Sequence, residues 1–428
     1  MATFLKKDFF SNNRKKLYNL LEPDSIVILF SADSYPRSGN QFFKFRQNSD
    51  IYYFSGLDQE ETIVLLHKDT KSETINEYAF ITEPDEEILV WTGHKYTKEE
   101  VRNISGIENT EYLDAFQKSI KQIINQADNI YYSFCGNIRA GNLKNLSLEN
   151  LKILISQEYK NKNQIDLDIY SHSLRVAKEK HEIQTIQRAC NITGECFSEI
   201  LKYVRPGVYE YQVEAEITRK LLSLGAQDFA YLPIIVSGRD NCVLHYTTNR
   251  KVCNDGDLLL LDFGSELDYY ASDVSRTIPV SGKYTKRQKE VYNSVLKVMK
   301  QIKQKFVTGN SIVNLNKECG ELIQNELLQL GLLKEQDIKK QNPEKPAYKK
   351  YFMHGVSHYM GLDIHDVGNR NAPLIPGMIL SCEPGIYIPE EGFGIRIEND
   401  ILITENSPVD LCKDIPIEAD EIEEIMNS

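Results

Sequence analysis

The first candidate for chemistry is an apolar strand that runs into a carboxylate. Leu258–Leu261 is a run of four leucines followed at once by Asp262, and Asp273 comes eleven residues later. Burial of a carboxylate is costly unless it is paired or bound to a metal ion. Gly264–Glu266 offers a turn, so a hairpin could bring both aspartates together, where they would need a shared cation or proton. Either aspartate alone fits an ordinary strand that ends in a turn.

The second candidate is a cluster of histidines. His354, His358 and His365 lie within twelve residues, although the whole chain has only 8 histidines. The first two are four apart and could share a helical face, and neutral imidazole suits Mn, Fe, Co and Zn. The segment is not HExxH, so it does not predict that class of zinc peptidase. Gly355 and Gly361 permit a close approach of the backbone. The alternative is a set of ordinary surface histidines.

Two more carboxylates follow apolar sequence nearer the C-terminus. Glu383 comes directly after an apolar run. Residues 394–403 alternate, which places Arg396, Glu398 and Asp400 on one face of a strand. This face could be exposed to solvent. It could also line a polar site in which Arg396 balances the carboxylates.

These segments together predict an oxygen-rich metal site. Four negative charges exceed what one divalent ion would balance, so two divalent ions that share bridging carboxylates fit better. Such a pair supports hydrolysis, because it makes a bridging water acidic. The candidate ligands are one histidine of the cluster with Asp262, Asp273, Glu383 and Glu398.

The elements that must position these residues begin with an α/β part. The chain has 428 residues, enough for two domains. We place the division in the polar segment 157–172. In the first part, hydrophobic periodicity predicts helices at 9–21, 97–104 and 112–125, and strands at 25–30, 51–54, 62–66 and 77–82.

The second part, from residue 174 on, shows one order of elements twice. Two long helices precede strands in each copy, which suggests an internal duplication. Ser311 fits the N-cap of one of these helices, and segment 334–350 reads as a solvated insertion. The predicted helices are 174–203, 209–224, 286–307 and 311–330, and the predicted strands are 231–236, 257–280, 378–388 and 394–404.

Composition disfavours several classes of protein. Lys and Arg number 50 against 62 Asp and Glu, a net charge of −12, so we expect no nucleic-acid partner. No apolar run approaches the ~20 residues of a membrane span. The first residues carry no apolar signal-peptide core. The 8 cysteines form no CxxC pair, which argues against a zinc ribbon, and we expect reduced thiols and a cytoplasmic location without a membrane partner.

The motifs resemble those of the pita-bread metallopeptidases, and most closely the aminopeptidase P (Xaa-Pro aminopeptidase) family. The resemblance implies an α/β N-terminal domain at 1–170 and an α+β pita-bread catalytic domain with internal pseudo-duplication at 174–428. Methionine aminopeptidase shares the core but usually lacks such an N-terminal domain. The matching segments are LLLLDFGSELDYYASDVSRT, MHGVSHYMGLDIHDVG, CEPGIYI and GIRIEND in the second part, and FRQNSDIYYFSGL in the first.

The resemblance implies a dinuclear centre with five ligands. Asp262 would bind one ion, and Asp273 and Glu398 would bridge both. His358 and Glu383 would complete the second. The metal of the family is usually manganese, which suits carboxylate ligands. A hydroxide that bridges the ions would attack the peptide bond before proline, so the implied activity releases an N-terminal residue from Xaa-Pro peptides.

Further residues match positions around the metals. The resemblance implies that His245, His354 and His365 bind substrate and stabilise the oxyanion. Arg396 would hydrogen-bond the ligands, and Glu383 is the first candidate for the general base. It also implies a homo-oligomer, a dimer or tetramer, that acts on proline-containing peptides.

Several alternatives stay open. Prolidase shares both domains and cleaves the Xaa-Pro dipeptide. A non-catalytic binding module and a metal-free creatinase-type hydrolase share the fold, but the filled ligand set disfavours both. Arg370 lies in a loop shorter than that of close relatives and could replace an arginine found there. Trp91 either packs in a core or lines the active site of a neighbouring subunit.

Overall fold

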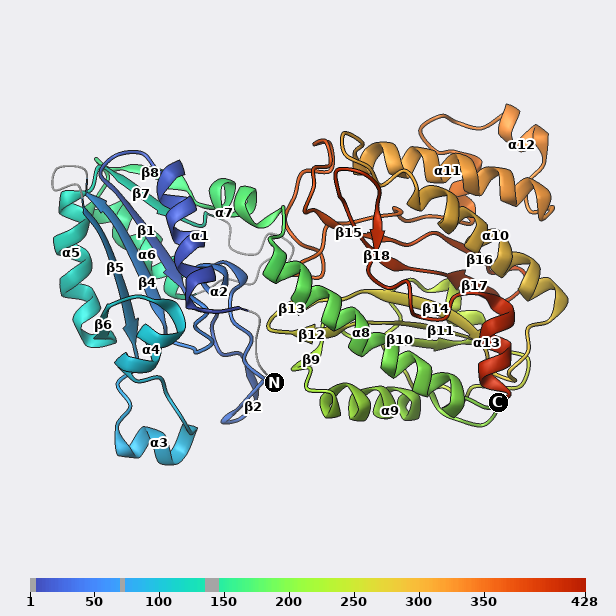
Figure 1. Ribbon diagram of the computed structural model, residues 1–428, viewed down its shortest axis with the longest axis horizontal. Coiled ribbons are helices and arrows are strands. Elements are labelled where there is room, and N and C mark those ends of the chain that lie inside the picture. The colour runs from blue at the N-terminus through green and yellow to red at the C-terminus, as the bar shows by residue number, and fades with distance from the viewer. Residues whose placement is uncertain (1–4, 70–73, 135–145) are drawn as a thin grey trace. The chain divides into compact units, whose positions relative to one another are not determined.

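The chain folds as two compact units, Leu5–Arg175 and Val176–Ser428 (Figure 1). The computed structural model describes residues 5–69, 74–134 and 146–428. The units divide between Arg175 and Val176, a few residues after the polar segment in which the sequence places the division.

The N-terminal unit is built on a mixed six-stranded sheet in the order β6-β5-β4-β1-β7-β8. The central β1 pairs antiparallel with β4 and parallel with β7, and its apolar sequence SIVILF is buried along almost its whole length. A strand covered on both faces reads as such a continuous apolar run. The strands are β1 Ser25–Phe30, β4 Ile63–Asp69, β5 Thr74–Ile81, β6 Asn109–Tyr112, β7 Asn129–Tyr132 and β8 Asn163–Asp166, with a separate exposed hairpin of β2 Pro36–Ser38 and β3 Gln41–Phe42.

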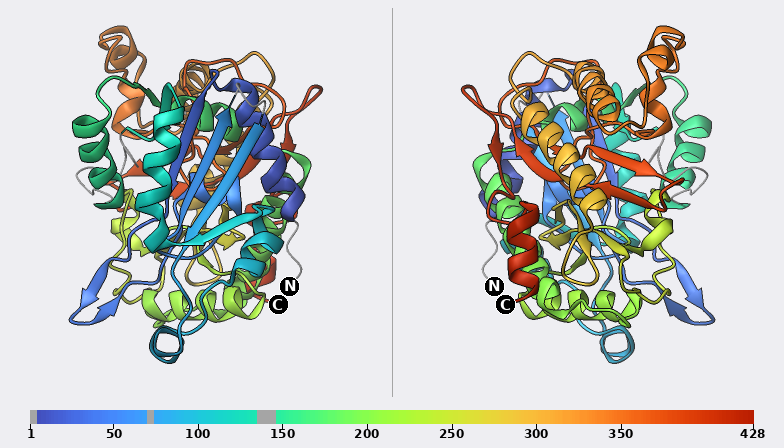
Figure 2. Two further views of the ribbon diagram at one scale, coloured as in Figure 1. Left: turned by 90° about the vertical axis from the view of Figure 1, so that its left-hand side faces the viewer. Right: turned by 90° about the vertical axis from the view of Figure 1, so that its right-hand side faces the viewer.

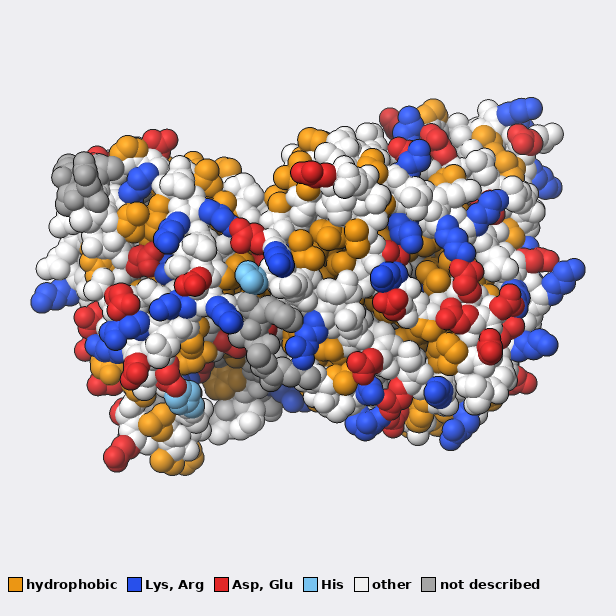
Figure 3. All heavy atoms as spheres, in the orientation of Figure 1, with side chains coloured by type: hydrophobic (Ala, Val, Ile, Leu, Met, Phe, Trp, Pro, Cys, Tyr) orange, Lys and Arg blue, Asp and Glu red, His pale blue; other side chains and the backbone are white. Residues whose placement is uncertain are grey.

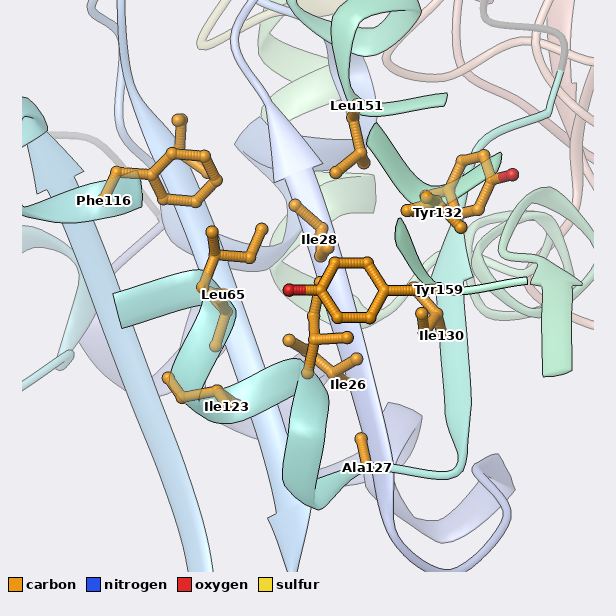
Figure 4. Packing of buried hydrophobic residues seen from close by; sticks show 14 of the residues in the cluster. Ile26, Ile28, Leu65, Phe116, Ile123, Ala127, Ile130, Tyr132, Leu151 and Tyr159 are labelled. Atoms are coloured by element: carbon orange, nitrogen blue, oxygen red, sulfur yellow. The ribbon is translucent and has the colours of Figure 1, made fainter. Parts of the chain in front are cut away.

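Two helices, α5 and α6, close one face of this sheet (Figure 4). Ile26 and Ile28 of β1 and Leu65 of β4 pack against Phe116 of α5 and Leu151 of α6. The left-hand view of Figure 2 looks onto this unit and shows its strands side by side. The helices of the unit are α1 Lys7–Leu20, α2 Ser49–Ser55, α3 Glu86–Thr92, α4 Lys98–Ser105, α5 Phe116–Gln126, α6 Leu146–Glu158 and α7 Asp168–Arg175, with the 3-10 turn η1 Leu113–Ala115.

One predicted strand of this unit is wrong. Residues 51–54 lie in the helix α2, not in a strand. The side chain of Asn48 caps the helix by accepting the amide N–H groups of residues 50 and 51, and Gly56 ends it with φ 70°. All four apolar side chains are buried, and periodicity cannot distinguish a short buried strand from a buried helical turn. The cap residues on either side carried the missing signal.

The C-terminal unit contains two antiparallel strand systems, each preceded by a helix pair, as predicted. The first comprises the sheets β10-β11-β14 and β13-β12-β9, and the second comprises β15-β18-β19 and the pair β16-β17. The strands are β9 Asp228–Phe229, β10 Ile234–Ser237, β11 Leu258–Phe263, β12 Ser265–Leu267, β13 Tyr270–Ala271, β14 Val274–Pro279, β15 Ile379–Cys382, β16 Gly385–Ile388, β17 Phe393–Arg396, β18 Asn399–Leu402 and β19 Val409–Asp410.

The helix pairs pack on these strands. α8 contacts β12, β13 and β14, whereas α10 contacts β15, β16 and β17; the right-hand view of Figure 2 shows α10, in amber, alongside the red strands. Ser311 caps α11 as predicted, since its Oγ accepts the N–H of Asn314 at 3.2 Å. The helices are α8 Lys180–Tyr203, α9 Glu210–Ser223, α10 Lys286–Lys303, α11 Ile312–Gln329, α12 Glu335–Lys339 and α13 Ala419–Met426, with η3 Gly238–Cys242 and η4 Ala347–Lys350.

The helix predicted from residue 174 begins later than expected, at Lys180. The side chain of Glu182 accepts the N–H of Glu179, which caps α8. Lys178, just before the cap, pairs through Nζ with Oδ2 of Asp366 at 3.0 Å, and both side chains are 1% exposed. Its amide also donates to the carbonyl of Gly377. These long-range contacts hold the residues before α8 in a non-helical conformation.

The exposure of Trp91 tests one of its two interpretations. Trp91 on α3 is 82% exposed, so the interpretation that it packs in a core is wrong.

Charged side chains of both signs are interspersed on each unit in Figure 3. Seven cysteines lie among the described residues and all are unpaired, while Cys135 lies outside them. In the part of the chain that the structure describes, no helix is long and apolar enough to cross a membrane.

Candidate metal centre and active site

The two aspartates come together on neighbouring strands. β11 and β14 pair antiparallel, with Asp262 opposite Ser275, so Asp273 lies just before the start of β14. The hydroxyl of Tyr231 lies 2.6 Å from Oδ1 of Asp262 and 2.6 Å from Oδ1 of Asp273. Both carboxylates are buried, 7% and 5% exposed. The two carboxylates therefore converge on one point, as predicted. The turn between them lies at Asp268 and Tyr269, however, and not at Gly264–Glu266, where β12 begins.

The histidines do not share a helical face, because residues 354–360 form no helix. Instead the segment runs beside β15: the carbonyl of His358 accepts the N–H of Ser381, and the carbonyl of Val356 accepts that of Glu383. Gly361 is required here, since a Cβ would lie 2.3 Å from a carboxylate oxygen of Asp366. Backbone pairing with β15, rather than helical spacing, positions the histidines.

His358 is oriented as a metal ligand would be. Its Nδ1 lies 3.0 Å from the carbonyl of Tyr359, which favours a proton on Nδ1. Its Nε2 lies 3.3 Å from Oδ2 of Asp273 and 3.7 Å from Oε1 of Glu383. An imidazole whose Nδ1 is held by a carbonyl presents its Nε2 to a metal ion.

Glu383 and Glu398 complete the convergence. Glu383 lies just after β15, and Ser381 donates to its Oε1 at 3.3 Å. Glu398 lies between β17 and β18, where the hydroxyl of Ser275 donates to its Oε2 at 2.7 Å. Ligand atoms of Asp273, His358 and Glu398 all lie within 4.8 Å of one another. Strands of both halves of the unit, and the histidine segment beside β15, thus bring the five predicted ligands to one site.

Arg396 faces this site and not solvent. It is 4% exposed and forms an ion pair with Asp262. It also donates to the hydroxyls of Ser275, at 2.9 Å, and Tyr387, at 3.0 Å. The face that carries Arg396, Glu398 and Asp400 is therefore buried and not exposed to solvent.

The site carries more negative charge than its cations balance. Burial and the charges of neighbouring carboxylates raise the pKa of Glu398 well above its ordinary value. Burial raises the pKa of Glu383 to about 7, despite the opposing charges of His358 and Arg396. Burial also raises the pKa of Asp262, although Arg396 opposes the shift. The donor set, four carboxylates and one imidazole with a single guanidinium behind them, fits a pair of divalent cations.

His354 belongs to a hydrogen-bonded chain beside the carboxylates. Its Nε2 lies 2.8 Å from the hydroxyl of Tyr387, which also accepts from Arg396. Its Nδ1 lies 2.7 Å from the carbonyl of Gly355 and 3.4 Å from Oε2 of Glu383. Burial, and then the charge of Arg396, lower its pKa to about 3. A neutral ring with its proton on Nδ1 would donate to the carbonyl of Gly355 and accept at Nε2 from the tyrosine.

The other predicted residues lie at the edge of the site. The ring of His365 is 4.4 Å from that of His358, centroid to centroid, and is exposed. His245, after η3, is also exposed, and its charge contributes to the lowered pKa of His354. Arg370 is exposed too, and its guanidinium lies 3.1 Å from where a Cβ on Gly355 would stand.

Two tyrosines of the site carried little signal in the sequence. Tyr231 precedes β10 and joins the two aspartates; Tyr387 on β16 links His354 to Arg396. The chain has 24 tyrosines, so type alone could not single these out. The position of Tyr387 within CEPGIYI, four residues after Glu383, was the available signal.

The comparisons with known proteins agree with this geometry. Residues 184–405 match the model of metallopeptidase family M24, and residues 10–131 match that of the aminopeptidase P N-terminal domain. The chain is 33% identical to the Xaa-Pro aminopeptidase of Escherichia coli over 99% of this chain and 98% of that protein. It is 30% identical to human Xaa-Pro aminopeptidase 3 over 96% of this chain and 84% of that protein.

Solved structures match over the same extent. Aminopeptidase P from E. coli with the inhibitor Pro-Leu superposes with a TM-score of 0.91 at 31% identity, covering 100% of this chain and 99% of that one. Proline aminopeptidase P II from Yersinia pestis gives 0.89 at 32% identity, covering 99% and 100%. The two units are thus an aminopeptidase P N-terminal domain and a pita-bread catalytic domain. The chain belongs to the aminopeptidase P family of the M24 metallopeptidases, which are divalent-metal hydrolases.

Proposed function

We propose that this enzyme removes the N-terminal residue from peptides whose second residue is proline. The observation that carries the proposal is the convergence of four carboxylates and His358 on one site, with Arg396 as the cation behind them. Three of the carboxylates are buried and that of Glu383 is half-buried. The family and the names of the relatives support the choice of substrate.

The five ligands would hold two divalent ions, and their carboxylate-rich chemistry suits Mn²⁺. Asp262 would bind the first ion, and His358 and Glu383 would bind the second. Asp273 and Glu398 would bind both ions. When bound, the ions supply Lewis acidity, which lowers the pKa of a water and polarises a peptide carbonyl.

Residues of the chain would accept a proton from the attacking water and bind the substrate. Glu383, which lies beside His354 and His358, would take the proton of the attacking water. His245, His354 and His365 would bind the substrate and stabilise the oxyanion. Arg396 would position Asp262 and Tyr387.

We also propose a cytoplasmic homo-oligomer, a dimer or tetramer. Unpaired cysteines throughout the described residues support a reducing compartment. Trp91, 82% exposed on α3, is the kind of aromatic that a partner subunit covers. Sedimentation of the wild-type chain and of Trp91→Ala tests the oligomer and its dependence on this residue.

The test of the activity is release of the first residue from an Xaa-Pro-Xaa peptide, with and without Mn²⁺, beside the matching Xaa-Pro dipeptide. Manganese-dependent cleavage of the longer peptide is the expected result. Cleavage of the dipeptide alone would assign prolidase activity instead. Absence of cleavage of either substrate by the metal-loaded protein would overturn the proposed substrate.

A further inference from the structure

Behind the ligand Asp273 lies a second cluster of metal-binding groups, which the proposed reaction does not use. Cys190 of α8, Asp400 of β18 and Cys412, just after β19, place their sulfur and carboxylate oxygen atoms within 4.8 Å of one another. The three side chains are at most 1% exposed. The fold thus brings the sulfur atom of Cys190 together with a carboxylate and a second sulfur atom from residues more than 200 positions later in the sequence.

The hydrogen bonds of Asp400 leave one of its two carboxylate oxygens without a partner. Its Oδ2 accepts the backbone N–H of Asp273 at 3.0 Å and the thiol of Cys190 at 3.2 Å. Its Oδ1 has no hydrogen-bond partner among the described residues, although it is buried. An unpaired buried carboxylate oxygen is costly, and a cation between this oxygen and the two sulfurs would satisfy it.

A cavity gives the cluster a route of entry. Its volume is about 570 Å³, and Cys190 and Cys412 both form part of its wall. The rest of the wall comes from α8, α9 and residues 411–415, including Glu195 and Lys220. The cavity could also supply a water as a further ligand.

We propose that Cys190, Cys412 and Asp400 form a second metal site that takes a thiophilic divalent cation such as Zn²⁺. Binding would replace the two thiol protons: the ion, two thiols and the carboxylate give a dithiolate–carboxylate complex and two released protons. Three protein ligands and a water make the four-coordinate geometry that zinc adopts. The sulfur ligands give this site a different metal preference from the dinuclear centre, whose oxygen-rich ligands suit manganese.

A disulfide switch between the two cysteines is the less favoured use of the cluster. A bound cation would satisfy Oδ1 of Asp400, whereas a disulfide would leave it unpaired.

The first test uses Co²⁺ as the probe on the full chain, with the dinuclear centre loaded with Mn²⁺ beforehand. Cobalt bound to sulfur gives a thiolate-to-metal charge-transfer band in the near ultraviolet, which the carboxylate and histidine ligands cannot produce. The band should appear in the wild-type chain and be lost in Cys190→Ser and Cys412→Ser. Cys196→Ser, a buried cysteine of the same helix outside the cluster, should retain it. No band in the wild-type chain, or a band that survives both substitutions together, would overturn the site.

The second test needs no variant, so poor folding of a substituted chain cannot obscure it. X-ray absorption at the zinc edge of the zinc-loaded wild-type chain should show sulfur neighbours at about 2.3 Å. A shell of nitrogen and oxygen alone would overturn the proposal. Neither test measures peptide cleavage, so both outcomes are independent of the proposed peptidase function.

Discussion

At the scale of single residues, Asp273 connects most of the site. Its side chain contacts Tyr231 and His358, and its backbone amide donates to Asp400. Asp273 thus contacts both another predicted ligand and the cluster behind the site. Asp273 therefore tests the assignment of the whole centre.

We expect Asp273→Ala to lower kcat/KM on an Xaa-Pro-Xaa peptide by about 10³-fold or more, because loss of a bridging ligand removes several kcal/mol of metal-derived stabilisation. Metal content measured on the same sample should fall as well. Asp255→Ala, at an exposed turn of the same unit, is the control and should retain activity. Full activity in the Asp273 variant would refute the ligand set.

Residue types and their order in the sequence were enough to predict part of the site. Strand-end carboxylates such as Asp262 and Glu383 were evident because an apolar run leads into each. The orientation of Arg396 toward the site was not, since an alternating strand is compatible with either face exposed. Tyr231 was missed because its role depends on the distance between two strands, which no local pattern encodes.

At the scale of elements, the long helices and apolar strands were predictable and the short segments were not. β1 matches its prediction residue for residue, and α9 and α11 match to within one residue at each end. The two segments failed for different reasons: the local caps Asn48 and Gly56 make residues 51–54 helical, whereas contacts distant in sequence set the histidine segment. Residues 356–360 are extended because β15 offers backbone partners.

The N-cap of α11 gives a prediction for a local feature. Ser311→Ala should lower the free energy of unfolding of the C-terminal unit by about 1 kcal/mol, because the N–H of Asn314 loses its acceptor. Urea denaturation followed by circular dichroism measures the change. Ser281→Ala, in an exposed turn, should alter it by less than about 0.5 kcal/mol. Equal effects of the two substitutions would contradict a capping role.

The start of α8 should make stability depend on pH. Burial raises the pKa of Glu182 from 4.5 to about 7, although Glu179 and Tyr270 donate hydrogen bonds to it. The folded state therefore holds this proton more tightly than the unfolded state. The resulting stabilisation is complete below about pH 4.5 and is lost as the pH rises through about 7, with a size of about 3 kcal/mol.

Glu182→Gln should remove this dependence. The stability of the variant relative to the wild type should rise between pH 5 and pH 8, as measured by urea denaturation at both values. A glutamine can still accept the amide of Glu179 in the capping box. Glu321→Gln, exposed on α11, is the matched control and should show no such trend. A constant difference between wild type and Glu182→Gln would mean that Glu182 is ionised in the folded state.

At the scale of the whole molecule, one buried ion pair ties the beginning of the catalytic unit to the loop that follows His365. Lys178 and Asp366 are 188 residues apart in sequence, and both side chains are 1% exposed. The pair lies directly before α8, so it fixes the entry of the chain into the unit.

Lys178→Met should lower the free energy of unfolding of this unit by about 3–5 kcal/mol, because it leaves Asp366 buried without its cation. Lys300→Met breaks an exposed pair with Glu418 and should cost no more than about 1 kcal/mol. Thermal and urea unfolding of both variants measure the difference. A loss of similar size in the two variants would show that Lys178 has no special role.

The unbalanced charge of the metal centre has a consequence for the life of the protein in a cell. Without metal, folding must bring buried carboxylates together around one guanidinium. Metal that binds only the folded state adds about 2.7 kcal/mol of stability at a hundredfold excess over its Kd. Chelation should therefore lower the melting temperature and speed proteolysis, and Mn²⁺ should restore both. If neither changes, metal and folding are not coupled. Where they are, metal starvation reduces the number of enzyme molecules, because the unloaded chain is degraded before it can be loaded.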